Sequence, residues 1–168
     1  MAFSAAERRR AETIAARYPH AKSATLPLLH LVQERDGWVT PQGIEDVADF
    51  VGLTPAIVLG TCSFYTMFKT EPVGKHQIQL CRTLSCTMRG CEDLQETIER
   101  KLGIGPGEKT ADGKFSFELV ECLGACGNAP VMRMDNRFWN DLTVEKLERV
   151  IDACRDGRDP SGEDFSRG

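Results

Sequence analysis

Four cysteines in two close pairs are the residues of this sequence whose type and spacing could do chemistry. Cys81 and Cys86 are separated by four residues. Cys122 and Cys126 are separated by three. Because thiolates are ligands for zinc and for iron-sulfur clusters, two such pairs brought together by the fold could hold either centre. These four cysteines are therefore the candidate metal and cofactor ligands.

The spacing leaves two kinds of centre open. In zinc loops the two cysteines of a pair are separated by two to four residues, so the spacings of four and three lie near the upper limit for zinc. A 2Fe-2S cluster divides four thiolates between two irons, and wider spacings suit it, although neither common ferredoxin pattern is matched. Small residues in 123–125 and 127–129 would let backbone N–H groups approach the sulfurs. The residues favour a cluster and leave a four-cysteine zinc structural module as the alternative.

Cys91 competes for a place among the ligands, because it follows Cys86 at the same spacing of four residues. Met88, Cys91, Leu94 and Ile98 recur at intervals of three, three and four, which is the period of one helix face. We therefore place Cys91 on the buried face of a helix, as a small apolar residue.

Cys62 and Cys154 have no cysteine at ligand spacing and are also interpreted as structural. Seven cysteines without an export signal argue against a disulfide framework and for a reduced compartment. No Cys-x-x-Cys occurs, which counts against thioredoxin-type dithiol chemistry.

Composition narrows the class of protein. The 168 residues are 41% hydrophobic and 27% charged, enough for a folded core. The net charge is -4 and the basic residues are interleaved with acidic ones, so no nucleic acid partner is expected. No apolar run approaches the ~18 residues of a membrane span, so we expect no direct membrane insertion. We expect a cytoplasmic bacterial protein, with the mitochondrial matrix as the alternative.

Residues 1–75 are expected to form a small helical bundle. Ser4 followed by Glu7 is a capping box that opens a first helix. Thr40 and Thr54, each followed by proline, are start signals for two more, because proline fits the first helical position. A fourth helix is expected between the first and these two.

From residue 76 the pattern changes to strands alternating with helices. Apolar and polar residues alternate in two short runs, which predicts half-buried strands whose ends carry the cysteine pairs. The expected elements are strands 76–81 and 115–121, a helix from about Thr87 to Leu102, a hairpin turning at Asp135-Asn136, and a helix starting at Thr143.

This order predicts a mixed sheet flanked by helices. The fold class is therefore α+β, with an N-terminal small helical bundle followed by a thioredoxin-like α/β domain. We expect the helical domain in 1–75, the thioredoxin-like domain in 76–155, and a polar C-terminal tail in 156–168.

The segments around the cysteines resemble a known family. They read CRTLSC in 81–86 and VECLGACGNAP in 120–130. Over residues 5–154 the chain resembles the small 2Fe-2S subunit of the NADH dehydrogenase module of respiratory complex I, the family of the 24 kDa subunit. The other matching segments are 36–39, 64–68, 104–108 and 110–115.

This resemblance implies a thioredoxin-like ferredoxin domain that holds one 2Fe-2S cluster. It also implies a partner flavoprotein subunit that carries FMN, NADH and a 4Fe-4S cluster, together with further oxidoreductase subunits. In the family the 2Fe-2S cluster exchanges single electrons with the flavin. The ligands that it implies are Cys81, Cys86, Cys122 and Cys126.

The expected function is therefore electron transfer in an NADH:quinone oxidoreductase. No set of catalytic side chains stands out, so no turnover is expected from the isolated chain. The resemblance does not choose between complex I and the related subunit of NAD-dependent formate dehydrogenases or NAD-reducing hydrogenases. Loops 82–86 and 123–130 are expected at or near the contact with the flavoprotein.

Overall fold

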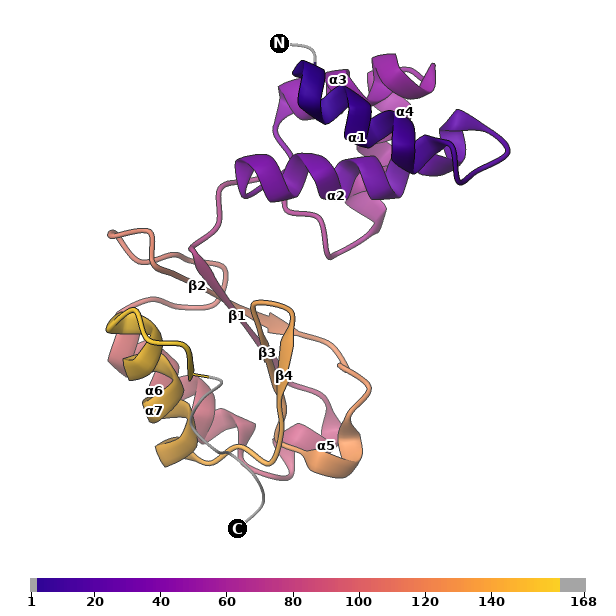
Figure 1. Cartoon of the computed structure of the whole chain (residues 1–168). Coiled ribbons are helices and arrows are strands. Elements are labelled where there is room, and N and C mark those ends of the chain that lie inside the picture. The colour runs from indigo at the N-terminus through magenta and orange to yellow at the C-terminus, as the bar shows by residue number, and fades with distance from the viewer. Residues whose placement is uncertain (1–2, 161–168) are drawn as a thin grey trace. The chain divides into compact units, whose positions relative to one another are not determined.

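The computed structural model describes residues 3–160. The chain divides into two compact units after Pro72, and each is described by itself (Figure 1). The predicted polar tail lies outside the described residues from position 161 onward.

The first unit is helical, as predicted. Its capping box is present, because Ser4 Oγ accepts a hydrogen bond from the Glu7 N–H and the Glu7 carboxylate accepts one from the Ser4 N–H at 2.8 Å. Thr40 Oγ1 likewise accepts from the Gly43 N–H at 3.0 Å. The helices are α1 (Ala5–Ala15), the 3-10 turn η1 (Ala21–Ala24), α2 (Thr25–Asp36), α3 (Pro41–Val51) and α4 (Pro55–Phe64).

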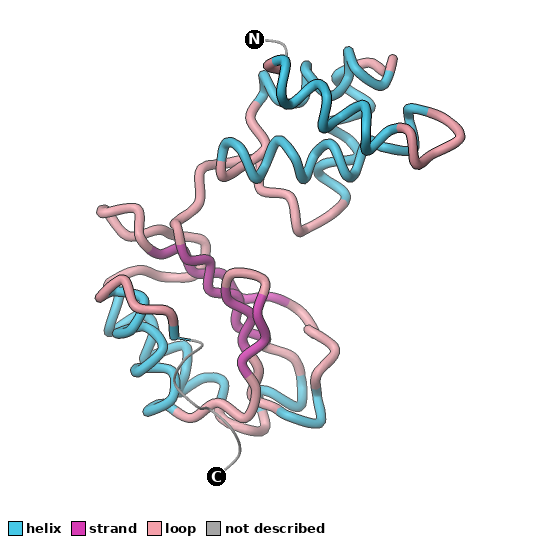
Figure 2. The backbone as a smooth tube through the Cα atoms, in the orientation of Figure 1, coloured by secondary structure: helices cyan, strands magenta, loops and turns pink. Residues whose placement is uncertain are grey.

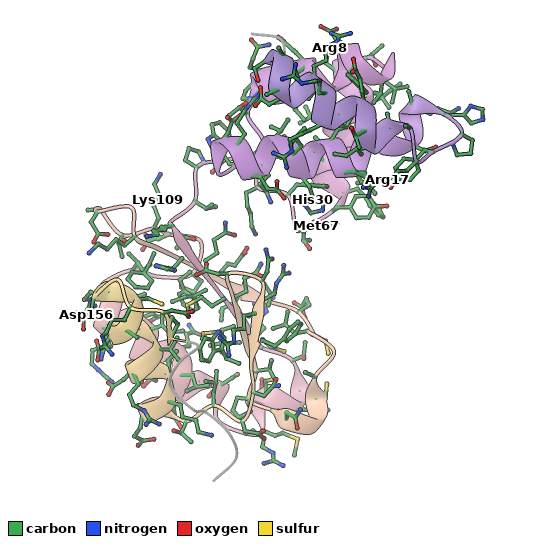
Figure 3. The ribbon with its side chains drawn as sticks, in the orientation of Figure 1. Arg8, Arg17, His30, Met67, Lys109 and Asp156 are labelled. Carbon is green, nitrogen blue, oxygen red and sulfur yellow. The ribbon has the colours of Figure 1, made fainter. Side chains whose placement is uncertain are left out.

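The segment after α4 is anchored on α2. The Gln33 side chain donates to the Met67 carbonyl at 3.0 Å and accepts from the Lys69 N–H at 2.8 Å. Phe68 is buried, and its ring centroid lies 4.8 Å from that of His30. His30 and Met67 are labelled in Figure 3. These contacts close the core of the helical unit.

Helix α4 has no charged residue and buries little of its surface. Val58 and Cys62 are buried, whereas Ile57, Leu59 and Phe64 are exposed. Among the described residues no single helix is long and apolar enough to cross a membrane. Helices α3 and α4 together pass that test on length and composition, but they are bent by 115°.

The second unit contains a four-stranded mixed sheet, shown in magenta in Figure 2. The strand order is β2-β1-β3-β4, with β1 parallel to β2 and the other two pairs antiparallel. Its elements are β1 (His76–Cys81), α5 (Leu84–Thr87), α6 (Cys91–Leu102), β2 (Phe115–Val120), the 3-10 turn η2 (Cys126–Asn128), β3 (Met132–Met134), β4 (Arg137–Trp139) and α7 (Val144–Arg155).

One face of the sheet forms the main core. Helices α6 and α7 lie side by side against this face (Figure 1). In β1, Ile78 and Leu80 are fully buried on that face, whereas the Gln79 side chain donates to Glu118 at 2.7 Å on the other. The prediction of half-buried strands is confirmed. The largest fully buried side chains of this core are Phe115, Phe117, Ile78, Leu80, Leu94, Ile98, Met132, Leu147 and Ile151.

The helix predicted from about Thr87 to Leu102 begins later, at Cys91, and the separate short helix α5 ends at Thr87. Gly90 adopts φ +85° and separates α5 from α6, which begins at Cys91. Met88 was expected on the buried face with Cys91, and this was wrong, since its side chain is 78% exposed. The predicted hairpin is confirmed, because Asp135 and Asn136 adopt the positive φ angles of a two-residue turn.

Gly74 lies where the chain enters β1, and a Cβ there would overlap the backbone of Phe115 and Ser116. We expect Gly74→Ala to lower the free energy of unfolding by about 1–3 kcal/mol. The added methyl group would push the start of β1 away from β2. The matched control is Gly60→Ala in α4, where the space is open, and it should stabilise the helix by about 0.5–1 kcal/mol. Denaturant unfolding of both variants checks this, and equal stabilities would contradict it.

Candidate metal centre

The parallel pairing of β1 with β2 brings both cysteine pairs to one edge of the sheet. Cys81 is the last residue of β1 and lies opposite Val120, the last residue of β2. Cys122 follows two residues later. Since the carboxyl ends of parallel strands meet at the same edge, the loops that carry the remaining cysteines start side by side.

The first pair is buried. Cys81 and Cys86 are each 2% exposed, and Cys86 lies on α5, the short helix that follows β1. They share a small apolar cluster with Ala129 and Val131, from the segment that leads into β3. This half of the candidate centre is therefore enclosed by the protein.

The second pair is exposed and its sulfurs are close together. The turn η2 begins at Cys126 and places its Sγ 3.5 Å from that of Cys122. Two thiolates on one tetrahedral metal lie on the order of 4 Å apart, given metal–sulfur bonds of ~2.3 Å. The separation observed here therefore fits two ligands of one metal ion.

Hydroxyl side chains on the segment between Cys81 and Cys86 act on sulfurs of both pairs. Thr83 Oγ1 lies 3.2 Å from Cys81 Sγ, and Thr83 also lowers the pKa of Cys122. Ser85 acts to lower the pKa of Cys126, against the larger effect of Cys122. The sequence reasoning did not single out these two residues, although hydroxyl side chains between two candidate ligands were a usable signal.

The pKa values of the two buried thiols are shifted in opposite directions. Burial and the neighbouring Cys81 raise the pKa of Cys86 to about 11. Burial also raises the pKa of Cys81, but hydrogen bonds from Thr83, the Leu123 backbone and Cys86 outweigh it and lower that pKa. Cys81 is therefore the first sulfur of this pair to lose its proton.

The exposed pair shows the same division. Hydrogen bonds from the Gly124 backbone and from Cys126 lower the pKa of Cys122. The hydrogen bond to Cys122 and the negative charge of Cys122 raise the pKa of Cys126. The charge on Cys81 opposes ionisation of both. All four sulfurs thus lie within one electrostatic environment, in which a bound cation would favour the thiolate form of each.

Backbone N–H groups point at the sulfurs, as the small residues of this loop predicted. The Gly124 N–H donates to Cys122 Sγ at 3.4 Å, and Gly124 adopts φ +79° in this turn. The Val131 N–H acts on Cys86 and lowers its pKa against the effect of burial. Such donors stabilise negative charge on sulfur and therefore suit a thiolate centre.

The three remaining cysteines are all buried. Cys91 packs in the same small cluster as Cys81 and Cys86, with its Sγ 3.7 Å from Thr87 Oγ1. Cys62 and Cys154 belong to the cores of the two units instead. Within residues 3–160 no three cysteine, histidine or acidic side chains surround a single point at the separations of a mononuclear metal site.

The chain is similar to known proteins over most of its length. Residues 11–155 match the family model of the thioredoxin-like 2Fe-2S ferredoxins. An NADH-quinone oxidoreductase subunit of Thermus thermophilus is 43% identical over 146 residues, covering 85% of this chain and 81% of that protein. An NADH-quinone oxidoreductase subunit of Rickettsia bellii is 45% identical over 148 residues, covering 86% of this chain and 89% of that protein.

The fold also matches a solved structure. The crystal structure of an NAD+-reducing NiFe hydrogenase in the air-oxidised state superposes with a TM-score of 0.74 at 21% identity. The match covers 83% of this chain and 24% of the hydrogenase chain, so it concerns the fold alone. Together, the family match and the relatives above 40% identity show that the chain belongs to the thioredoxin-like 2Fe-2S ferredoxins.

Proposed function

We propose that the chain is the electron-transfer subunit of an NADH:quinone oxidoreductase of the complex I type. The observation that carries this proposal is the meeting of two cysteine pairs at one sheet edge, in a chain 43–45% identical to NADH-quinone oxidoreductase subunits. The proposed ligands of one 2Fe-2S cluster are Cys81, Cys86, Cys122 and Cys126.

The donor set fits this cluster. A 2Fe-2S cluster needs two thiolates for each iron, and the sulfurs come as one buried pair and one exposed pair. Cys122 and Cys126 would share one iron, and Cys81 and Cys86 the other. A bound cluster supplies reversible storage of one electron at a low potential, on the order of -400 mV for four cysteine ligands.

The residues around the sulfurs stabilise their negative charge and exclude water. With a thiolate at position 81, the Thr83 hydroxyl becomes the donor of the 3.2 Å hydrogen bond. The Gly124 N–H donates to Cys122. The apolar cluster around Cys81 and Cys86 keeps water from one side of the centre. Donors to sulfur and exposure to water raise the potential, and burial lowers it.

The partner follows from the chemistry of NADH, which delivers electrons in pairs as hydride. A flavin can accept the pair and pass single electrons to an adjacent one-electron centre. We therefore place FMN, NADH and a 4Fe-4S cluster on a flavoprotein subunit, and expect further oxidoreductase subunits beyond it. In bacteria the assembly would lie in the cytoplasm and be held at the membrane through the complex; the alternative is the mitochondrial matrix.

A second candidate is the same module in an NAD-reducing hydrogenase or NAD-dependent formate dehydrogenase. The fold that this chain shares with a chain of an NAD+-reducing NiFe hydrogenase, at 21% identity, is compatible with this candidate. The relatives at 43–45% identity favour the quinone-linked enzyme.

The function can be tested by anaerobic reoxidation of the reduced chain. The reconstituted chain should be brown, and dithionite should bleach its visible absorption without the partner. Because a centre on the order of -400 mV is more reducing than NADH, NAD+ should restore the absorption, and only when the FMN-loaded flavoprotein subunit is present. A colourless protein that retains zinc would support the structural-module alternative, and a reduced chain that NAD+ cannot reoxidise through the flavoprotein would contradict the proposed electron transfer.

Cys122→Ser should weaken or abolish cluster retention, because an alkoxide is a poorer ligand for iron than a thiolate. The matched control is Cys91→Ala, which should keep the visible spectrum and cost mainly packing, on the order of 1 kcal/mol. Iron and sulfide content of both proteins after identical reconstitution is the measurement. Loss of the cluster in the Cys91 variant with retention in the Cys122 variant would overturn the ligand assignment.

Thr83→Val removes a hydroxyl 3.2 Å from a proposed ligand sulfur while keeping its shape. We expect the potential to fall by about 40 mV, the one-electron equivalent of a hydrogen bond worth about 1 kcal/mol. Thr87→Val is the control, since that hydroxyl donates to the Arg82 carbonyl at 3.0 Å and lies near Cys91 instead. The measurement is a redox titration monitored by paramagnetic resonance. Equal shifts of the reduction potential in the two variants would refute the role of Thr83.

A further inference from the structure

A pocket of about 360 Å³ lies in the second unit at the amino end of β1. It is lined by Lys75 and His76, by residues of the β3–β4 hairpin and by the segment 157–160 that follows α7. His76 begins β1 and Cys81 ends it, so the pocket lies about 17 Å from the candidate centre, at ~3.3 Å for each residue of a strand. Its volume is within the range of small-molecule sites. We call it the hairpin pocket.

Two cations of the hairpin pocket have no anionic partner among residues 3–160. The Arg137 guanidinium lies over the Trp139 ring, 4.9 Å from the ring centroid. This contact holds the guanidinium in place without using its N–H donors. Lys75 is exposed, and neither it nor Arg137 forms an ion pair with a described carboxylate. Both side chains are therefore available to donate to a bound ligand.

One carboxylate of the lining already has partners. Asp135 Oδ1 accepts a hydrogen bond from the Gln77 N–H at 3.0 Å, and Asp135 Oδ2 lies 2.6 Å from His76 Nδ1. These bonds tie the turn of the hairpin to the start of β1 and hold the wall of the pocket in place. Asp135 therefore shapes the pocket more than it neutralises Lys75 and Arg137.

The other charges leave the hairpin pocket cationic. Asp159 and Arg158 complete the charged residues of the described lining, and Arg158 donates to Asp156 at 3.1 Å. With His76 neutral, this lining carries three cations and two carboxylates. The whole chain has a net charge of -4, so an excess of cations is a local feature of this pocket.

We propose that the hairpin pocket binds a small phosphate monoester, with Arg137 and Lys75 holding its phosphate group. Such an ester carries a charge of about -1.5 to -2 at neutral pH, which matches two unpaired cations. The planar guanidinium donates two parallel hydrogen bonds to a phosphate, and lysine adds a point charge. The volume leaves room for the organic part, beside the buried Met134 and Trp139. This binding is separate from electron transfer, because the described lining contains none of the proposed cluster ligands.

The test uses the reconstituted full chain, with phenyl phosphate as the probe. Nuclear magnetic resonance should show the indole N–H signal of Trp139 moving as phenyl phosphate is added, because Arg137 lies over that ring. Trp38, in the helical unit, is the internal control, and its indole signal should not move. The titration should give a Kd of about 1 mM or tighter, the strength of a pair of charge-assisted hydrogen bonds. Phenyl sulfate has the same shape with one negative charge and should bind about tenfold more weakly.

Arg137→Gln and Lys75→Gln should each weaken the binding of phenyl phosphate about tenfold, because each removes a charged donor. Lys75 is exposed, so its replacement still tests the proposal if Arg137→Gln fails to fold. Asp159→Asn should strengthen binding about threefold, because it removes a negative charge from the lining. The matched control is Arg9→Gln, which removes an exposed cation of the helical unit and should change binding by less than about twofold.

The proposal is overturned if phenyl phosphate moves neither indole signal or both equally, or if Lys75→Gln binds it as tightly as Arg9→Gln does. Equal binding of phenyl sulfate would show attraction to any anion, and tighter binding of succinate would assign the pocket to dicarboxylates. Either result contradicts a phosphate site, as does weaker binding by Asp159→Asn. Failure of the proposed electron transfer is a separate outcome, since the parent chain would then lack iron and sulfide while the Trp139 signal still moved.

Discussion

The candidate centre depends on the parallel pairing of β1 with β2. This register sets Cys81 opposite Val120, so the chain leaves both strands at one edge and the two cysteine loops begin together. A shift of the register by one residue would turn the buried faces of these strands toward solvent, because side chains alternate along a strand. The hydrophobic core under α6 and α7 therefore fixes the position of the sulfurs as well as the fold.

The four sulfurs are held in two different environments. Cys81 and Cys86 are enclosed among apolar groups, whereas Cys122 and Cys126 face solvent on a loop with small residues. Leu123 and Ala125 of the second loop pack against the cluster that contains Cys81 and Cys86, so the two loops are held together. The buried pair is protected from water, and the exposed pair can be approached by another protein. A centre that exchanges electrons with another protein requires both.

Local patterns in the sequence were enough to predict most elements. The alternation of apolar and polar residues predicted β1 and β2, and the capping box predicted the start of α1. The Asp135-Asn136 pair predicted the hairpin. Each of these patterns depends on residues that are close in the chain. The break at Gly90 was missed, since helical periodicity continues through it and only the backbone angle reveals it. Met88 was consequently placed on the wrong face. The place of Thr83 beside Cys81 Sγ, where it also lowers the pKa of Cys122, depends on tertiary packing and could not be predicted from spacing alone.

The central claim is that these cysteines enclose two bridged irons. Iron and acid-labile sulfide should be measured on the chain after anaerobic reconstitution, together with low-temperature paramagnetic resonance of the dithionite-reduced sample. The account predicts two irons and two sulfides for each chain, with the signal of a reduced 2Fe-2S cluster. A correctly folded chain without labile sulfide, or with one zinc ion on the same cysteines, would contradict it.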